Sequence, residues 1–202
     1  MSMLHACRRA GVAGVAAHCN FHLRGEESMR DEAFVRQTCA ALGVTLHVTD
    51  FDTDTYCSQR KLSLEMGCRE LRYEWFRRLA KECGLQRIAV AHNADDDTET
   101  MLLNLLRCTG IRGLTGMKGD NGEIIRPLLP FSRAEIQDYL DSIGAEWITD
   151  SSNLASDFKR NFLRNEILPA LRSRWPGLDK TLARTRAHLC DSAHLADSAL
   201  TR

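Results

Sequence analysis

Apolar positions in the first half of the chain alternate between strand-like and helix-like spacing. Three short apolar runs are typical of buried strands: residues 12–21, 44–51 and 88–92. Three segments in which apolar side chains recur every three or four residues predict helices: 31–42, 71–83 and 96–107. This alternation predicts an α/β fold, with a Rossmann-like parallel sheet and helices on both of its faces.

The following part of the chain predicts one more strand-like segment and another helix. Residues 124–129 form the strand-like segment. Ser132 and Glu135 have the spacing of a capping box, which opens a helix that ends at Gly144. The short apolar stretch at residues 1–10 resembles a helix without its beginning.

Charge is distributed unevenly along a chain that is neutral overall. The chain has 202 residues, 44% of them hydrophobic, so one sizeable core is expected. We expect an α/β domain over residues 1–150 and a basic helical extension over 151–202. Segment 159–186 has two acidic residues and eight basic ones: Lys159, Arg160, Arg164, Arg172, Arg174, Lys180, Arg184 and Arg186. This excess predicts a phosphate backbone as a partner, although a solvated helix surface explains it equally well.

The cysteines point to a reducing compartment. All eight are scattered, and no CxxC pair suggests a zinc site or a thioredoxin-like redox motif. The sequence shows no secretory leader and no apolar run long enough to cross a bilayer. We therefore expect reduced thiols in the cytoplasm and no membrane partner, and the sequence leaves a homodimer open.

Polar side chains follow the predicted strands, and ligands bind at the carboxyl ends of parallel strands. They form three groups: His18, Asn20 and His22; Asp50 and Asp52; and residues 92–99. Because the strands are expected to share one sheet, we expect the three groups to meet at one rim.

Three consecutive aspartates, Asp95, Asp96 and Asp97, stand where a strand passes into a helix. Their charges repel one another unless a hard cation such as magnesium or the helix N-terminus offsets them. An ordinary acidic helix start accounts for them as well. A metal-dependent hydrolase is a further alternative, with a site built from four residues: His18, His22, His92 and Asp95.

Several motifs in order resemble the tRNA(Ile)-lysidine synthases, a family of the PP-loop ATP pyrophosphatase superfamily. The resemblance runs from about residue 10 to residue 190. It rests on these segments: 17–28 (AHCNFHLRGEES), 69–73 (RELRY), 91–100 (AHNADDDTET), 105–114 (LLRCTGIRGL), 126–129 (RPLL), 150–153 (DSSN), and the pairs Arg160-Asn161 and Arg164-Asn165 before Leu168-Pro169. Each motif is weak, but their order and spacing together are specific.

The resemblance implies a nucleotide-binding domain over residues 1–150 and an extension that leads to tRNA-binding domains. It also implies a ligase in which ATP adenylates the ring carbonyl oxygen of the wobble cytidine in tRNA(Ile) with a CAU anticodon. Free lysine then displaces AMP and forms lysidine. ATP and magnesium are the expected cofactors.

The resemblance also implies a set of site residues. Catalytic residues are expected at Asp95, Asp96 and Arg107, with the two aspartates holding magnesium. Nucleotide contacts are expected at Ser2, His18, Asn20, His92 and Arg112. Lysine or tRNA contacts are expected at Glu99, Asp150, Asn153, Arg160 and Arg164. Arginine suits phosphate and carboxylate because its planar fork binds two oxygens at once.

The chain departs from the family at its beginning and at two other positions. Family members carry a Ser-Gly-Gly-x-Asp-Ser loop that cradles the pyrophosphate, whereas this sequence starts at what resembles the residues after that loop. A sheet without the strand before that loop lacks a central member, and nucleotide binding is expected to be weak. Asn93 replaces a usual histidine, and Cys108 replaces a usual glycine. A catalytically inactive family member that binds RNA is therefore a second hypothesis.

Overall fold

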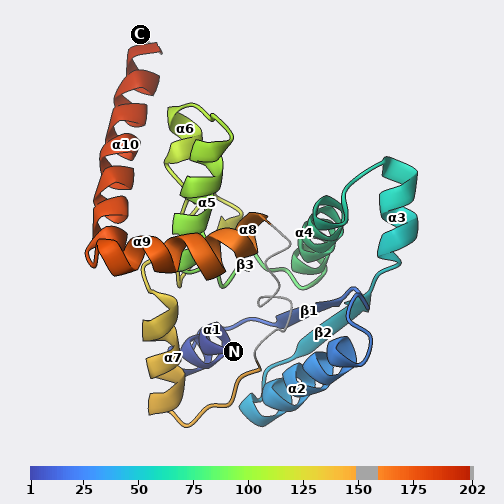
Figure 1. Cartoon of the computed structure of the whole chain (residues 1–202). Coiled ribbons are helices and arrows are strands. Elements are labelled where there is room, and N and C mark those ends of the chain that lie inside the picture. The colour runs from blue at the N-terminus through green and yellow to red at the C-terminus, as the bar shows by residue number, and fades with distance from the viewer. Residues whose placement is uncertain (149–158, 201–202) are drawn as a thin grey trace. The chain divides into compact units, whose positions relative to one another are not determined.

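The computed structural model describes residues 1–148 and 159–200, and it divides into two units (Figure 1). The first unit contains Met1–Ala89 and Gly122–Ile125, and the second contains Val90–Asn121 and Arg126–Arg202. Each unit is described by itself below. None of the described helices is both long and apolar enough to span a bilayer.

The first unit is built on a parallel strand–helix–strand element. Strands β1 (Ala16–Asn20) and β2 (Leu46–Asp50) pair in parallel, with Asn20 opposite Asp50, and helix α2 (Glu26–Leu42) connects them. α2 ends at Gly43, whose φ of 63° is a left-handed conformation that glycine adopts without steric cost. The predicted strand–helix–strand alternation is therefore confirmed in this part of the chain.

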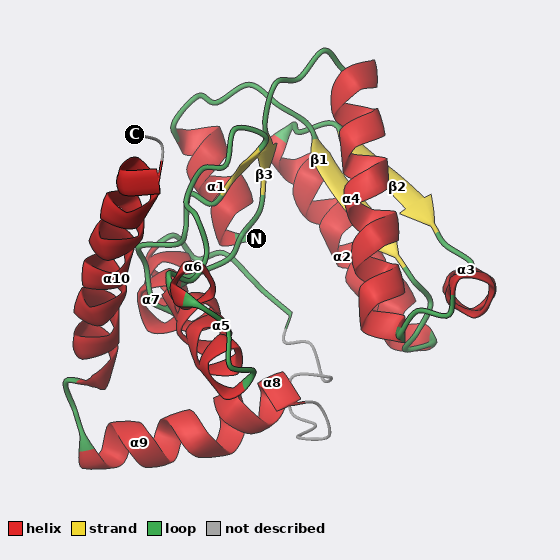
Figure 2. Cartoon of the chain, turned by 90° about the horizontal axis from the view of Figure 1, so that it is seen from above, coloured by secondary structure: helices red, strands yellow, loops and turns green. Residues whose placement is uncertain are grey.

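Further helices and a second strand pair complete the first unit. They are α1 (Ser2–Arg9), α3 (Thr53–Arg60), α4 (Leu64–Glu82), β3 (Ile88–Ala89) and β4 (Ile124–Ile125). Figures 1 and 2 show α2 and α4 on opposite faces of the β1–β2 pair, as the α/β pattern predicts. The apolar side of α4 is buried through Tyr73, Trp75 and Leu79. Helix α3 was not predicted, although Asp52 caps its first turn by accepting from the Thr55 amide at 3.1 Å.

The strands are shorter than the apolar runs predict, and they do not form one continuous sheet. Among the described residues they form two parallel pairs, β1 with β2 and β3 with β4. An interior strand must pair along both of its edges, and none of these four strands does so.

The second unit is helical. It contains α5 (Ala94–Leu106), α6 (Ile111–Leu114), α7 (Arg133–Ser142), α8 (Lys159–Phe162), the π-helical turn η2 (Leu163–Ile167), α9 (Leu168–Arg174) and α10 (Leu178–Leu200). α8, η2 and α9 follow one another without a break. Met101, Leu163, Leu168 and Ala193 are buried, so α5, η2, α9 and α10 all contribute to the core of this unit.

Two local features, the start of α7 and the backbone at Cys108, agree with what the sequence indicated. Ser132 and Glu135 form the predicted capping box at the start of α7. Cys108, where the family usually has glycine, has a φ of 57°. A side chain in that left-handed region costs about 1–2 kcal/mol, so the preference for glycine there has a conformational reason.

Candidate functional site

Helix α5 begins with four carboxylates, each of which meets an arginine from the C-terminal part of the same unit. We call these eight residues the acid–arginine cluster: Asp95, Asp96, Asp97 and Glu99 with Arg160, Arg164, Arg172 and Arg186. The sequence predicted both partners' segments as charged, but it predicted neither the pairing nor the part played by Arg172 and Arg186. Neither a cation nor the helix dipole alone is therefore needed to offset the aspartates.

The cap of α5 fixes where this acidic turn begins. The Asn93 side chain accepts from the Asp96 amide at 3.0 Å, and the Asp96 carboxylate accepts from the Asn93 amide at 3.1 Å. This reciprocal capping box satisfies two amides that the first turn leaves without helical partners. Asn93 therefore has a structural reason to be present where the family usually has histidine.

Glu99 is the most deeply buried carboxylate of the cluster, with 1% of its side chain exposed. Arg164 grips it with two bonds, from Nε to Oε1 at 2.6 Å and from Nη2 to Oε2 at 2.8 Å. Arg160 adds a bond from Nε to Oε2 at 2.8 Å. A bidentate guanidinium–carboxylate pair with both oxygens occupied satisfies a charge that would otherwise be very costly to bury.

Asp96 is held by the same arginine that holds Glu99. Arg164 Nη2 lies 3.1 Å from Asp96 Oδ1, and Arg160 Nη2 donates to the Asp96 carbonyl at 3.0 Å. Burial alone would lower the pKa of Arg164, but its bonds to Glu99 and the nearby aspartates raise it. This guanidinium is therefore permanently charged and fixes the spacing of the two carboxylates.

Asp95 and Asp97 each pair with an arginine and also accept a hydrogen bond from a backbone amide. Asp95 accepts from Arg172 Nη2 at 2.8 Å and from the Arg133 amide at 2.8 Å. Burial would raise the pKa of Asp95, but these two donors outweigh it and lower the pKa. Asp97 pairs with Arg186 and accepts from the Met117 amide at 2.6 Å.

The basic segment predicted as an RNA-binding surface therefore divides into two sets. Four of its arginines point into the acid–arginine cluster, where carboxylates neutralise them. The other four basic residues are exposed: Lys159, Arg174, Lys180 and Arg184. The sequence therefore overestimates how many cations of this segment are available to bind phosphates, because half of them are paired with carboxylates.

The remaining predicted residues of the second unit lie around α5. Arg107 is exposed and follows the last residue of α5, and Arg112 is exposed on α6 and pairs with Asp197. His92 Nδ1 accepts from Arg126 Nε at 3.1 Å, a contact that sequence reasoning missed. Two further predicted residues, Asp150 and Asn153, lie outside the described residues.

The predicted residues of the first unit lie at the carboxyl end of β1 and at α1. Asn20 is 2% exposed and donates to Glu32 at 2.8 Å, while its Oδ1 accepts from the His22 amide at 3.0 Å. Burial is the main cause that lowers the pKa of His18. Ser2 is buried at the start of α1. These residues and α5 belong to different units, so their convergence on one rim stays a prediction.

The donors of α5 suit magnesium better than zinc. In the described part of the chain, no group of three or more His, Cys, Asp and Glu residues could hold a metal by itself. A zinc site requires at least three protein ligands. Magnesium beside a nucleotide is bound through one or two carboxylates together with substrate phosphates, and Asp95 and Asp96 provide two carboxylates one residue apart.

A domain model and several curated proteins that match this chain point to the same family. The model of the PP-loop domain matches residues 1–171. A tRNA(Ile)-lysidine synthase of Bacteroides thetaiotaomicron is 48% identical over 100% of this chain and 48% of its own length. The synthase of Porphyromonas gingivalis is 51% identical over 94% of this chain and 42% of its own length. The synthase of Chlorobaculum tepidum is 43% identical over 100% of this chain and 59% of its own length.

A solved structure agrees on the fold. The U34-tRNA thiolase NcsA from Methanococcus maripaludis superposes with a TM-score of 0.67 at 15% identity, covering 88% of this chain and 61% of that chain. The chain spans about half the length of the curated synthases that it matches. Domain match and relatives agree with the motifs at residues 17–28, 91–100 and 105–114, and the chain belongs to the PP-loop domain family.

Proposed function

We propose that this chain is the nucleotide-binding part of a tRNA(Ile)-lysidine synthase. The reaction joins free lysine to the wobble cytidine of the tRNA(Ile) with a CAU anticodon. The ring carbonyl oxygen first takes the adenylyl group of ATP and releases diphosphate. The lysine amine then forms the new carbon–nitrogen bond, loses a proton, and AMP departs. The names of relatives that match nearly the whole chain support the substrates.

The observation that carries this proposal is the acid–arginine cluster at the start of α5. It places Asp95 and Asp96, with 18% and 16% of their side chains exposed, beside the guanidiniums of Arg172 and Arg164. In our proposal these two carboxylates would hold magnesium with the nucleotide, and the ion would supply positive charge beside the phosphates. Their remaining lone pairs are available, because a carboxylate offers about four acceptor positions.

We assign distinct roles to the other residues. Arg107 is exposed and binds phosphate oxygens or the lysine carboxylate, and Arg112 does so when its pair with Asp197 opens. Glu99 acts through Arg160 and Arg164, because its own oxygens are buried against them. Ser2, His18 and Asn20 are our proposed nucleotide contacts in the first unit, and His92 is the proposed contact in the second. Asp150 and Asn153 contact lysine or tRNA.

The cellular setting that we propose is the cytoplasm, where tRNA is modified. Eight free cysteines support a reducing environment.

The test measures incorporation of labelled lysine into a tRNA(Ile) transcript with a CAU anticodon, in the presence of ATP and magnesium. We expect lysine incorporation and AMP formation that depend on one another, and Asp95→Asn should abolish both. Turnover of Asp95→Asn at the rate of the unmodified chain would remove this residue from the site. A transcript with a CAU-to-GAU anticodon change is the matched negative substrate.

A second function is favoured by one observation, the exposed basic residues Lys159, Arg174, Lys180 and Arg184. A chain that binds tRNA without modifying it would show RNA binding but no lysine incorporation in the same assay. The metal-dependent hydrolase that the histidines suggested has no support among residues 1–148 and 159–200, which offer no cluster of three metal ligands.

A further inference from the structure

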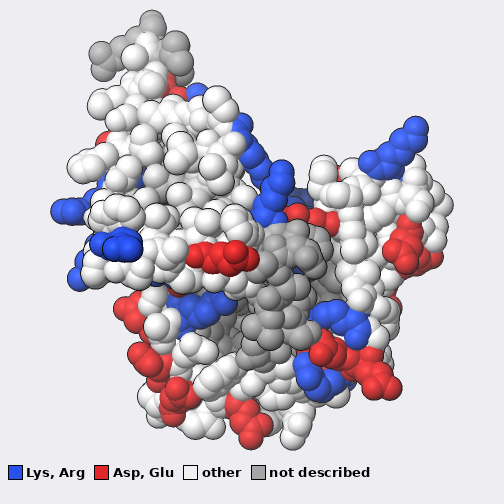
Figure 3. All heavy atoms as spheres, in the orientation of Figure 1, with Lys and Arg blue, Asp and Glu red and all other residues white. Residues whose placement is uncertain are grey.

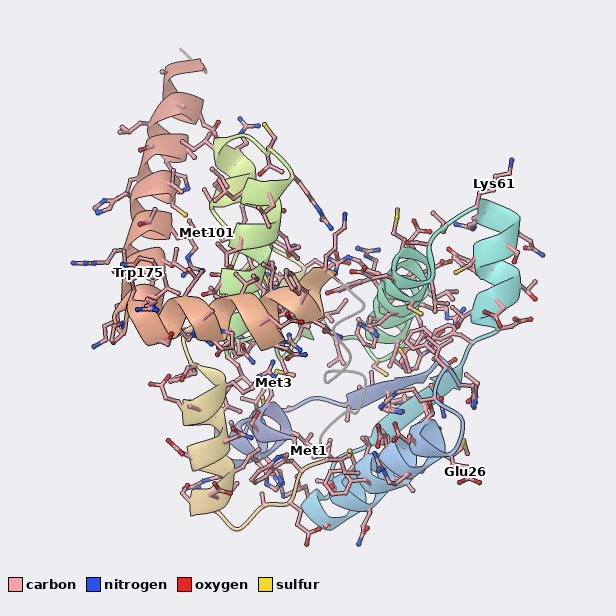
Figure 4. The ribbon with its side chains drawn as sticks, in the orientation of Figure 1. Met1, Met3, Glu26, Lys61, Met101 and Trp175 are labelled. Carbon is pink, nitrogen blue, oxygen red and sulfur yellow. The ribbon has the colours of Figure 1, made fainter. Side chains whose placement is uncertain are left out.

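The corner between α9 and α10 exposes an aromatic ring among cations. Trp175 follows the last residue of α9 and is 59% exposed, and Figure 4 shows it at this corner. Arg174 precedes it, and Lys180 and Arg184 follow on α10, all three exposed. The space-filling view shows Lys and Arg groups standing on the surface around this part of the molecule (Figure 3).

The carboxylate close to this corner in the sequence is already engaged. Asp179 accepts from Arg172 at 2.8 Å, and Arg172 also bonds Asp95. In the described part of the chain, no ion pair joins Arg174, Lys180 or Arg184 to an acidic group. The corner therefore keeps its positive charge, whereas the four arginines of the acid–arginine cluster are neutralised by carboxylates.

The geometry of α10 aligns the cations. Lys180 and Arg184 are four residues apart and lie on one face of the helix. Arg186 and Ala193 face the other way, since Arg186 pairs with Asp97 and Ala193 is 5% exposed. The exposed row of α10 thus continues the surface that begins at Arg174 and Trp175.

We propose that the α9–α10 corner, defined as Arg174, Trp175, Lys180 and Arg184, binds an unpaired stretch of RNA. A base stacks on the indole of Trp175, and the three cations contact neighbouring phosphates. Every base has a flat face that stacks on an aromatic ring, and phosphates attract exposed Lys and Arg. The proposal rests on the proposed function insofar as that function supplies an RNA substrate, and it specifies where the RNA is held.

The composition of the corner favours RNA over a protein or a membrane. Within residues 159–199, the large apolar side chains that are exposed are Phe162, Trp175 and Leu195. Trp175 stands alone at the corner, whereas protein interfaces have apolar cores made of several such residues. Membrane-binding helices likewise carry a whole apolar face. An exposed ring with three exposed cations on the adjoining helices matches a nucleotide, which combines a flat base with a charged phosphate.

The experiment titrates the 202-residue chain with a fluorescently labelled RNA hairpin whose loop contains CAU. We expect Trp175→Ala to weaken binding roughly 5- to 150-fold, the range measured for base–aromatic stacking. Trp175→Phe should restore most of it. The triple change Arg174→Ala, Lys180→Ala and Arg184→Ala should lower the steepness of log K against log salt by about 2, since each phosphate contact contributes about 0.7. Lys81→Ala, an exposed change on α4, should alter neither quantity.

Trp175 fluorescence gives an independent readout. The chain has three tryptophans, of which Trp75 is 8% and Trp147 is 38% exposed, so quenching on RNA binding is assigned to Trp175 by its loss in Trp175→Phe. Thermal melting of each variant checks that the fold is retained, which is expected because these side chains are exposed. Hairpin binding that is unchanged in Trp175→Ala and in the triple variant would overturn the proposal. Loss of self-association in Trp175→Ala with unchanged RNA binding would assign the corner to a second copy and overturn it too.

The two proposals fail in different ways. A chain that binds the hairpin through this corner but does not incorporate lysine supports the corner and counts against the ligase. If Trp175→Ala and the triple variant both incorporate lysine with the same rate and the same KM for tRNA as the unmodified chain, the ligase proposal is supported and the RNA-binding corner is overturned.

Discussion

Replacing Glu99 with glutamine removes the charge at the centre of the acid–arginine cluster while preserving the shape of the side chain. Three guanidinium bonds of 2.6 to 2.8 Å then lose their ionic acceptor. Arg164 retains its pair with Asp96, and 17% of its side chain is exposed, so water compensates poorly for the lost charge. Arg160 has 35% of its side chain exposed and is rehydrated more easily.

The expected loss in the free energy of unfolding is about 3–5 kcal/mol, the cost of breaking a buried ion pair on one side. For a chain of this size this lowers the Tm by roughly 6 to 20 °C. Calorimetry or circular dichroism near pH 7 measures it. The matched control is Glu82→Gln, because Glu82 has 63% of its side chain exposed and meets Arg78 at 3.9 Å. That change should stay within about 0.5 kcal/mol of the unmodified chain.

A double-mutant cycle with Arg164→Met separates the pairing from other effects of each change. We expect the double variant to be more stable than the sum of the single losses predicts, because neither partner is then left as an isolated buried charge. A Tm for Glu99→Gln equal to that of Glu82→Gln, or additive effects in the cycle, would refute the reasoning. Unchanged stability with a raised KM for lysine would instead make Glu99 a direct lysine ligand.

Three further outcomes follow from the same unit. Because folding lowers the pKa of Asp95, this residue contributes to stability fully above the ordinary carboxylate pKa of about 3.9, and the contribution is lost as the pH falls through the lower folded pKa. Below about pH 5, the free energy of unfolding measured with urea should therefore fall less steeply with acid in Asp95→Asn than in the unmodified chain. Gly116→Ala should destabilise the chain by about 1–3 kcal/mol, since φ is +71° and the new methyl would clash with Asp97 Oδ1. Gly119→Ala, with nothing within 4 Å of the new methyl, should have a much smaller effect in the same thermal melts. Arg107→Ala should change the free energy of unfolding by no more than about 0.5 kcal/mol, because Arg107 is exposed, and it should reduce lysine incorporation at least tenfold. Full activity would remove Arg107 from the site.

The features that could be predicted from the sequence are those determined over a few residues. The Ser132–Glu135 capping box and the glycine that ends α2 depend on side chains three or four positions apart, and both were found. The acidic turn at Asp95 and the cationic stretch that contains Arg160 were also recognised as charged, and each was assigned an external partner.

Their mutual pairing could not be found in the same way. Arg160 and Glu99 are 61 positions apart, and hydrophobic periodicity says nothing about which helices meet. One signal was available: Arg160 and Arg164 share a helix face at a spacing of four, and Asp96 and Glu99 share one at a spacing of three. Two matched faces of opposite charge in a chain of zero net charge favour internal partners over solvent.

The π-helical turn η2, between α8 and α9, determines which arginines can reach α5. Along a regular α-helix, Arg172 would point about 80° away from Arg164, because eight residues exceed two full turns by that angle. A turn with i→i+5 bonding takes more residues per revolution, so each residue rotates less and Arg172 swings back toward the side of Arg164. The extra residue in this turn therefore brings Arg164 and Arg172 to the same side, where both pair with carboxylates of α5. Without the π-helical turn, the same eight-residue separation would direct Arg172 away from Asp95, whereas Arg160, which precedes the turn, would keep its place.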